Sequence, residues 1–207
     1  MTIGKFNEWG RMISRPEIIL WCDSDKAVAD IATQYQQRQV PIPHIGLSGG
    51  SLVKALGVSP LGLNSEVHEL PIDLLHVTYR TTNHHLHESL VANSIVIRKR
   101  WWRGQILVIT NGGFLGSFEI AQRAHPNDGV FDVTEVDARI SYRQKLIARG
   151  RLARGAHVPH PMIGQRQSRS DSWIFAVPMG LYLDEVYRGR VTDLGVTLKP
   201  DVLKVVI

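Results

Sequence analysis

The first sixty residues alternate between short apolar runs and one segment of helical periodicity, which is the pattern of an α/β unit. Ala27, Ile31 and Tyr35 recur at the spacing of one helix face, and a glycine-rich stretch follows the second apolar run. The predicted elements, in chain order, are a strand at 17–21, a helix at 25–37, a strand at 42–47, a turn at 46–50 and a helix at 51–56. We therefore predict a small α/β domain at residues 1–66.

After Pro60 the pattern changes to strand-like runs that are separated by turn residues. These runs lie at 72–78, 94–97, 105–110, 129–136, 172–176, 181–184 and 203–207. One helix interrupts them at 140–155, with an apolar face of Ile140, Leu146, Ile147 and Leu152 and arginines on its other faces. The sequence thus predicts a mixed α+β chain. Its second domain would be a β-sandwich at 67–194 with one basic helix, entered through a loop at 59–71, and a strand at 195–207 would return to the first domain.

The composition is that of an ordinary globular chain, with 207 residues, 43% hydrophobic and 21% charged. The lone Cys22 cannot form an internal disulfide, and no apolar segment of the signal-peptide kind follows the N-terminal residues. No window approaches the ~18 consecutive apolar residues of a membrane-spanning helix. We expect a cytoplasmic protein.

Positive charge is concentrated in one segment. Residues 139–169 carry +8 and no acid, whereas the remaining 16 basic and 19 acidic residues sum to −3. Such a segment favours an anionic partner, either a phosphate-bearing ligand or an anionic membrane surface, over a solvated helix face that binds nothing. Nucleic acid is disfavoured, because Trp101 and Trp102 form the one aromatic cluster available for bases. The candidate anion-binding residues are Arg143, Lys145, Arg149, Arg151 and Arg154.

The stretch 46–50 matches the G-x-S-x-G pattern of a serine hydrolase, in which Ser48 would act with Asp128 and with His157 or His160. The preceding run contains two prolines and makes a poor buried strand, and no oxyanion segment of the His-Gly-Gly-Gly type precedes it. A glycine-rich turn is therefore the preferred interpretation, and the hydrolase is an alternative.

His84, His85 and His87 could ligate a transition metal, but a third ligand would have to come from elsewhere in the chain. We favour a polar hairpin loop at this tract. Asp128 has a clearer context, because an aspartate in a tight Asn-Asp-Gly turn is typical of sites for hard cations such as Mg²⁺.

A glycine cluster at 111–116, the Asn-Asp-Gly turn at 127–129 and the basic helix with its histidine-proline exit follow one another at fixed spacing. Their order resembles the bacterial diacylglycerol kinase and lipid kinase family. Residues 48–57 are similar to the loop and helix that end in Ala-Leu-Gly in that family, and residues 21–25 stand where its Gly-Gly-Asp-Gly-Thr phosphate loop would be. Asp184 and Glu185 resemble its Asp-Gly-Glu segment.

The resemblance implies an abbreviated nucleotide-binding domain, related to NAD kinases, beside a β-sandwich. ATP would donate its γ-phosphate to a lipid or another hydroxyl-bearing small molecule, with help from Mg²⁺. The implied catalytic residues are Asp23, which orients Mg·ATP, and Glu185, the base. The implied binding residues are Ser48, Gly49, Gly50, Asn111 and Gly112 for the nucleotide and Asp128 for a metal.

The chain departs from the family pattern in the loops that carry the chemistry. Trp21 and Cys22 replace two glycines, Asp25 replaces a threonine, and the glycine between Asp184 and Glu185 is missing, so that Val186 can occupy the glutamate position instead. Two functions stay open: an active lipid kinase, or a degenerate relative that binds a phosphate-bearing ligand or an anionic membrane. An abbreviated domain also leaves a sheet edge uncovered, which favours a homodimer.

Overall fold

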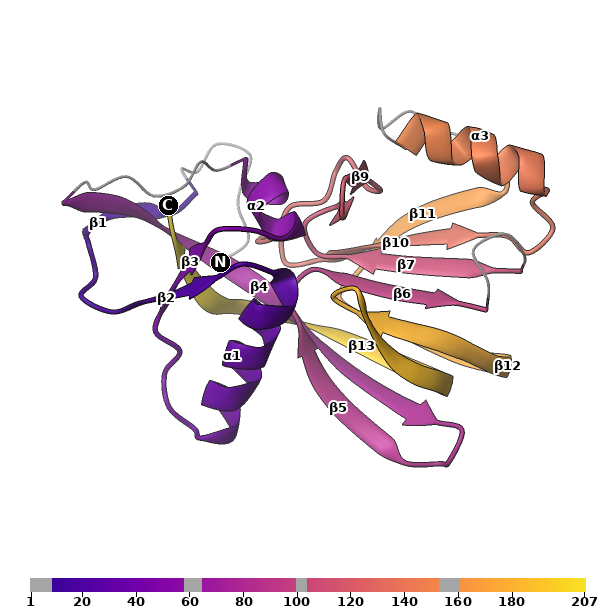
Figure 1. Ribbon diagram of the computed structural model, residues 1–207, viewed down its shortest axis with the longest axis horizontal. Helices are drawn as coiled ribbons and strands as arrows, with labels where there is room; N and C mark the ends of the chain where they lie inside the picture. The colour runs from indigo at the N-terminus through magenta and orange to yellow at the C-terminus, as the bar shows by residue number, and fades with distance from the viewer. Residues whose placement is uncertain (1–8, 58–64, 100–103, 153–160) are drawn as a thin grey trace.

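The computed structural model describes residues 9–57, 65–99, 104–152 and 161–207. Within them eleven strands form one continuous sheet and two short strands form a separate hairpin (Figure 1). The strands are β1 (Arg11–Ser14), β2 (Ile19–Cys22), β3 (His44–Leu47), β4 (Glu66–Thr81), β5 (Leu86–Val91), β6 (Ser94–Arg98), β7 (Ile106–Thr110), β8 (Phe114–Leu115), β9 (Phe118–Glu119), β10 (Phe131–Val136), β11 (Ile163–Ser168), β12 (Ser170–Leu183) and β13 (Val186–Val206). The helices are α1 (Asp25–Gln37), α2 (Ser51–Leu56) and α3 (Tyr142–Leu152). The predicted mixed class is confirmed, as a mostly antiparallel sheet with few helices.

The N-terminal part contains a parallel strand pair joined by a helix, as the sequence pattern predicts. β2 and β3 are parallel, and α1 connects them. Helix α1 begins after Ser24, whose hydroxyl accepts a hydrogen bond from the Ala27 amide (3.3 Å). Its buried Val28 and Ala32 belong to one apolar cluster with Ile45 of β3. This cluster fixes the β2–α1 loop against the sheet.

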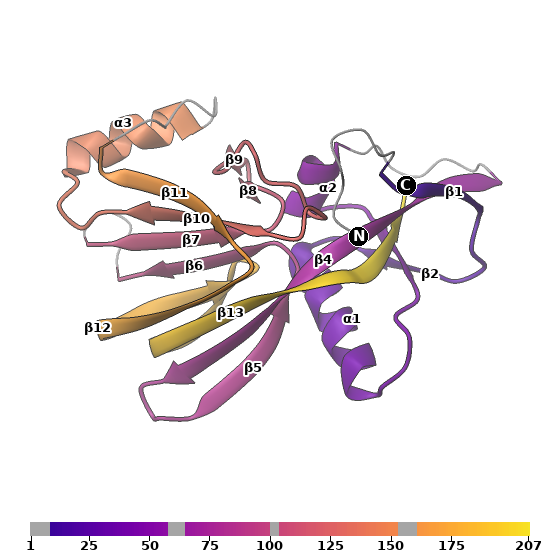
Figure 2. The same cartoon turned by 180° about the vertical axis from the view of Figure 1, so that it is seen from behind.

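Two long strands connect this part to the rest of the molecule. β13 pairs antiparallel with β4 from Val191–Thr81 to Val206–Glu69, and its last residues also pair in parallel with β3. Figures 1 and 2 show both strands crossing the centre of the molecule. Because β4 and β13 run from one half to the other, both halves belong to one sheet. The domain bounds at 1–66 and 67–194 stay predictions.

The other half has its own core between two groups of strands. β6, β7, β10 and β11 are antiparallel neighbours, and β6 also pairs with the end of β12, beside β13 and β4. Ile95, Phe131, Leu181 and Leu194 are buried in one cluster that draws on both groups. No helix among the described residues is long and apolar enough to cross a bilayer.

Several element predictions were wrong in extent. β4 begins at Glu66, inside the range 59–71 that was expected to be a loop, and β13 begins at Val186, nine residues before the strand that was predicted at 195–207. The exposed sequence Lys199-Pro200-Asp201 interrupts the apolar pattern of β13 at a bulge. β1, β5 and β11 were not predicted either, because their residues are mostly polar or exposed.

The predicted apolar face of the basic helix is also wrong. Ile140, just before α3, is buried, but Leu146 and Ile147 are 50% and 56% exposed. Among the α3 side chains that the structure describes, the buried one is Lys145, whose ammonium donates to the Gly104 carbonyl in the β6–β7 connection (2.8 Å). A lysine therefore anchors this part of the helix.

Phe131 is the largest fully buried side chain, and we expect Phe131→Ala to lower the free energy of unfolding by about 3–5 kcal/mol. Ile174→Ala is the matched control, because Ile174 is 90% exposed and its truncation should cost less than about 1 kcal/mol. Urea denaturation measures both. Equal losses in the two variants would contradict the position of the core.

Candidate functional site

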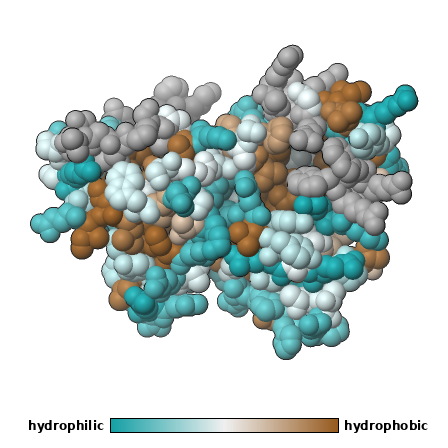
Figure 3. Space-filling model, in the orientation of Figure 1, coloured by the Kyte–Doolittle hydropathy of each residue, from teal (hydrophilic) through white to brown (hydrophobic). Residues whose placement is uncertain are grey.

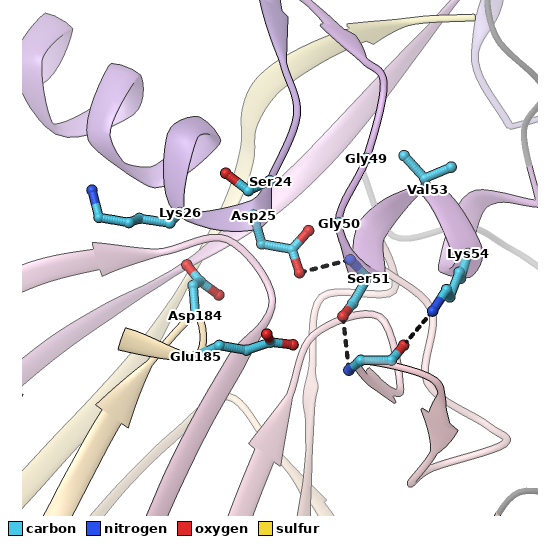
Figure 4. A pocket seen from close by; sticks show the side chains of 11 residues that line it. Ser24, Asp25, Lys26, Gly49, Gly50, Ser51, Val53, Lys54, Asp184 and Glu185 are labelled. Carbon is cyan, nitrogen blue, oxygen red and sulfur yellow. Dashed lines mark hydrogen bonds between the residues drawn. The ribbon is translucent and has the colours of Figure 1, made fainter. Parts of the chain in front are cut away.

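A cavity of about 360 Å³ opens where four loops meet, between the N-terminal part and the larger core (Figure 4). The loops are β2–α1, β3–α2, β8–β9 and β12–β13. The residues that line it are Ser24, Asp25, Lys26, Gly49, Gly50, Ser51, Val53, Lys54, Gly116, Asp184 and Glu185. Three of these are carboxylates and two are lysines, so the cavity is polar and rich in charge.

Asp25 lies on one wall and holds the beginning of α2. Its carboxylate accepts hydrogen bonds from the amides of Ser51 (2.9 Å) and Leu52 (3.0 Å). Burial raises the pKa of Asp25, and these two hydrogen bonds oppose that rise. Gly50 has φ +93°, and a β-carbon there would come within 2.3 Å of the Asp25 carboxylate. Gly50 is therefore explained by the close approach of Asp25.

Gly49 serves a similar contact between loops. A β-carbon at this position would come within 2.1 Å of the Asp23 carbonyl oxygen. The Asp23 side chain is exposed and accepts a hydrogen bond from the Ser24 hydroxyl (3.0 Å). Asp23 thus stands next to the cavity, on the far side of Gly49, and does not line it.

Trp21 and Cys22, which stand where the resembled phosphate loop has two glycines, have neighbours other than the cavity. The indole of Trp21 lies over Gly46 of β3, where a β-carbon would come within 2.7 Å of the ring. Cys22 faces the core, and burial raises the pKa of its thiol to about 11. Neither side chain lines the cavity.

The opposite wall is the two-residue turn between β12 and β13. Asp184 and Glu185 have φ of +43° and +67°, the positive values that a type I′ hairpin turn requires. The buried Asp184 carboxylate accepts hydrogen bonds from three consecutive amides, those of Ala92 (2.8 Å), Asn93 (3.0 Å) and Ser94 (2.9 Å). Burial raises the pKa of Asp184 to about 7, the amide bonds oppose this, and the charge of Asp25 adds to it.

Glu185 is the exposed carboxylate of the cavity and points into it from this turn (Figure 4). Across from it, Lys54 donates to the Gly116 carbonyl (2.8 Å), and the Gly116 amide donates to the Ser51 hydroxyl (3.1 Å). Lys26 stands at the start of α1 and pairs with Asp30. The cavity thus presents one accessible carboxylate, Glu185, opposite the ammonium group of Lys54.

The other predicted nucleotide-binding residues do not reach the cavity. Ser48 is exposed, and its hydroxyl donates to the Cys22 carbonyl (3.1 Å). Asn111 is buried and donates to the carbonyls of Asp73 (2.8 Å) and Ala92 (3.2 Å). These two side chains join loops beneath the site.

Gly112 also has a structural partner. Its amide donates to the Asn93 side chain (3.1 Å), and a β-carbon there would come within 2.6 Å of the Ala55 β-carbon. Gly112 therefore lets the β7–β8 connection approach α2 closely. Of the predicted catalytic and binding residues, the cavity brings together Gly49, Gly50 and Glu185.

Asp128 lies at the β9–β10 turn, away from the cavity. Its carboxylate accepts from the Val130 amide (3.1 Å) and is half-buried. Burial raises the pKa of Asp128 to about 6, and the charges of Asp132 and Asp73 add to this. Among the described residues no group of three or more His, Cys, Asp or Glu side chains could hold a metal ion. Asp128 as a metal ligand stays a prediction.

The histidine tract lies in the β4–β5 hairpin, as the preferred interpretation predicts. Thr82–His85 form the connection, and the ring of His87 stacks on Tyr79 with centroids 5.1 Å apart.

Four of the five predicted anion-binding residues belong to α3, which lies at the far end of the sheet from α1 (Figure 1). Arg143 is exposed, whereas Lys145 is buried and does not contribute to a cationic surface. The side chains of Arg149 and Arg151, and all of Arg154, His157 and His160, lie outside the described residues. The arrangement predicted for a hydrolase, Ser48 with Asp128 and a histidine, therefore has one member that the structure does not describe.

Sequence reasoning missed most of the cavity. Asp25 was noted only as a departure from a family pattern, and Lys26, Lys54 and Asp184 were given no role. A partial signal exists in Gly50, which immediately precedes a predicted helix. Glycine has no side chain that could cap the helix, so the first helix amides need an acceptor from elsewhere in the chain.

The fold is similar to that of solved protein structures from Bacillus anthracis str. Sterne. Two are candidate diacylglycerol kinases, with TM-scores of 0.59 and 0.57 at 11% identity, and each match covers 90% of this chain and 76% of that one. A third, a diacylglycerol kinase, has a TM-score of 0.52 at 12% identity over 90% and 74% of the two chains. No family model and no curated protein matches the sequence. The predicted resemblance to diacylglycerol kinases is confirmed at the level of the fold.

Asp184 should make stability depend on pH. Its pKa of about 7 in the folded protein exceeds the value of about 3.9 for an unfolded aspartate, so the folded state binds this proton more tightly. The contribution of Asp184 to the free energy of unfolding is then greatest below about pH 4 and is lost as the pH rises to about 7. Compared with Asp184→Asn, the wild type should lose up to about 1.4 kcal/mol per pH unit across this window.

Urea denaturation at a series of pH values measures the difference. Asp30→Asn is the control, because Asp30 is an exposed aspartate and its removal should leave the slope unchanged. A difference between wild type and Asp184→Asn that stays constant from pH 4 to pH 7 would show that Asp184 is ionised throughout.

Proposed function

We propose that this protein transfers the γ-phosphate of ATP to the hydroxyl of a diacylglycerol-like lipid or a related small-molecule alcohol, with Glu185 as the base. One observation supports this most directly. Of the three cavity carboxylates, Asp25 and Asp184 are buried and occupied by backbone amides, whereas Glu185 is exposed and points into the cavity. A base must reach the proton that it removes, and Glu185 is the acid placed to do so.

In this reaction the lipid oxygen forms a bond to the γ-phosphorus while the bond between that phosphorus and the β,γ-bridging oxygen breaks. The hydroxyl proton passes to Glu185, and ADP leaves with the electron pair. Lys54 and Lys26 would offset the negative charge of the phosphates, because both line the cavity. Positioning and charge neutralisation of this kind account for most of the catalysis in phosphoryl transfer.

When bound with ATP, Mg²⁺ would supply charge neutralisation, and the residue that would hold it is Asp23. The described residues contain no three-ligand metal cluster, but Mg²⁺ that arrives with ATP needs only one or two protein carboxylates. The exposed Asp23 fits that role, since its backbone packs against Gly49 at the edge of the cavity. Asp23 would then orient Mg·ATP from the β2–α1 loop.

A second candidate function is the binding of a phosphate-bearing ligand without turnover. The position of Asp25 favours this candidate over ATP turnover, because its carboxylate occupies the Ser51 and Leu52 amides at the start of α2, which the phosphates of ATP would otherwise use. Free amides at a helix start are a common phosphate site, and here they already have an anionic partner. Phosphate contacts would then have to come from the lysines alone.

Glu185→Gln should lower the rate of ³²P transfer from Mg·ATP to diacylglycerol in mixed micelles by about 10²–10⁴-fold, because the variant cannot accept the hydroxyl proton. Glu88→Gln is the control, since Glu88 is an exposed glutamate of β5 that does not line the cavity and should not affect the rate. The absence of transfer from the wild type to a panel of lipid and small-molecule alcohols would end the kinase proposal.

Lys54→Met should weaken the binding of glycerol 3-phosphate, measured by titration calorimetry, about fivefold, which corresponds to roughly 1 kcal/mol of lost charge interaction. Lys199→Met changes an exposed lysine outside the cavity and should bind as the wild type does. Binding that depends on Lys54, in a protein that transfers no phosphate, would establish the second candidate. Equal affinities of wild type and Lys54→Met would exclude a phosphate site beside Lys54.

A further inference from the structure

Helix α3 places apolar side chains in solvent and a lysine against the sheet. Tyr142, Leu146 and Ile147 are 55%, 50% and 56% exposed, while Lys145 between them is buried. Tyr142 and Leu146 are one helical turn apart, so the three side chains form a short continuous surface. We refer to Tyr142, Leu146 and Ile147 as the apolar ridge of α3. Figure 3 shows hydrophobic surface at this end of the molecule, with hydrophilic surface beside it.

The orientation of the ridge is fixed by specific contacts. Ser141 and Gln144 form a reciprocal cap, in which the Ser141 amide donates to the Gln144 side chain (2.9 Å) and the Gln144 amide to the Ser141 hydroxyl (3.3 Å). Ile140 is buried just before the helix, and Lys145 donates to the Gly104 carbonyl (2.8 Å). Lys145 thus holds one side of α3 to the β6–β7 connection, and the exposed ridge faces outward.

The charge around the ridge has one sign. Arg143 is exposed within the first turn of α3, and the sequence has no acidic residue between Asp137 and Asp171. Arg139 is neutralised by Asp137, but the segment as a whole keeps a large positive excess. A soluble phosphate ligand would need the arginines and not the ridge. A bilayer with anionic lipids satisfies both, because it offers negative headgroups above an apolar layer.

We propose that α3 docks on an anionic phospholipid bilayer, with the apolar ridge inserted at the headgroup boundary and the exposed Arg143 beside it among the headgroup phosphates. Three apolar side chains make a small insertion, so binding should be reversible and should depend on charge. The proposal extends the proposed lipid kinase function by naming the surface on which the protein would meet its lipid. Figures 1 and 2 draw α3, the β8–β9 hairpin and α2 along the same edge of the molecule, which is the edge where the cavity is lined by Gly116 and Lys54.

The test is co-sedimentation of the full chain with sucrose-loaded vesicles, in the absence of nucleotide. We expect the wild type to bind vesicles of phosphatidylcholine with about one third phosphatidylglycerol at least about tenfold more strongly than vesicles of phosphatidylcholine alone. The double variant Leu146→Ser/Ile147→Ser should lose about tenfold in binding to the anionic vesicles. Both positions are exposed, so the substitutions should leave the fold intact, which circular dichroism and thermal unfolding verify.

Two matched controls test whether vesicle binding depends on α3 itself. One removes an exposed apolar side chain elsewhere, and the other reverses an exposed charge elsewhere. Ile174→Ser removes an apolar side chain that is 90% exposed on β12 and should bind vesicles as the wild type does. Arg143→Glu should weaken binding, whereas Lys199→Glu, which reverses an exposed charge on β13, should have a smaller effect.

Equal binding to neutral and anionic vesicles, or undiminished binding of the ridge variant, would overturn the proposal. So would binding of a single-stranded RNA that competes with the vesicles and is insensitive to the ridge variant, because the segment would then be a nucleic-acid site. Glu185→Gln should bind vesicles normally. Failure of phosphoryl transfer and failure of membrane docking are therefore distinguishable, since each has its own readout and its own variant.

Discussion

A single buried aspartate, Asp73, fixes the place where three separate segments of the chain meet. Where β13 bulges between Lys199 and Leu203, its pairing with β4 is interrupted, and the Asp73 carboxylate of β4 accepts the Asp201 amide (2.9 Å) in its place. The same carboxylate accepts the Gly129 amide (3.1 Å), and the Asp73 carbonyl accepts from Asn111 (2.8 Å). The bulge, the β9–β10 turn and the end of β7 are thus fixed by one residue. Burial raises the pKa of Asp73, and the amide bonds offset part of that cost.

The walls of the cavity are held in the same way, by buried carboxylates that accept backbone amides. Asp184 binds three amides at the β5–β6 connection, and Asp25 binds two at the start of α2, so each wall is a carboxylate that serves a neighbouring loop. Backbone amides that would otherwise lack a strand or helix partner are satisfied in this way. As a result, the cavity carboxylates differ in what they can do. Asp25 and Asp184 hold backbone amides, and Glu185 is the one of the three whose carboxylate stays accessible.

The sequence was sufficient to predict those helix ends that are set by neighbouring residues. Ser24 before the helix at 25–37 and Gly57 after the helix at 51–56 mark ends that the structure reproduces. It was insufficient where partners are remote, because nothing near Asp25 or Asp184 indicates that each will bind amides 26 and about 90 residues away. The ordinary helical periodicity of α3 was misleading for a similar reason, since the contact that orients it joins Lys145 to the distant Gly104. The homodimer, ATP and Mg²⁺ stay predictions.

The distribution of charge separates two tasks. In the cavity the buried Asp25 and Asp184 already bind backbone amides, and Lys26 is paired with Asp30, so Lys54 carries most of the positive charge that a phosphate would meet there. A phosphate whose charge is balanced by a divalent cation would depend less on that lysine. The positive excess lies instead on the segment around α3, away from the cavity walls, where it can act on an extended anionic surface. Attraction to a charged bilayer and binding of a phosphate in the cavity would therefore rest on different residues.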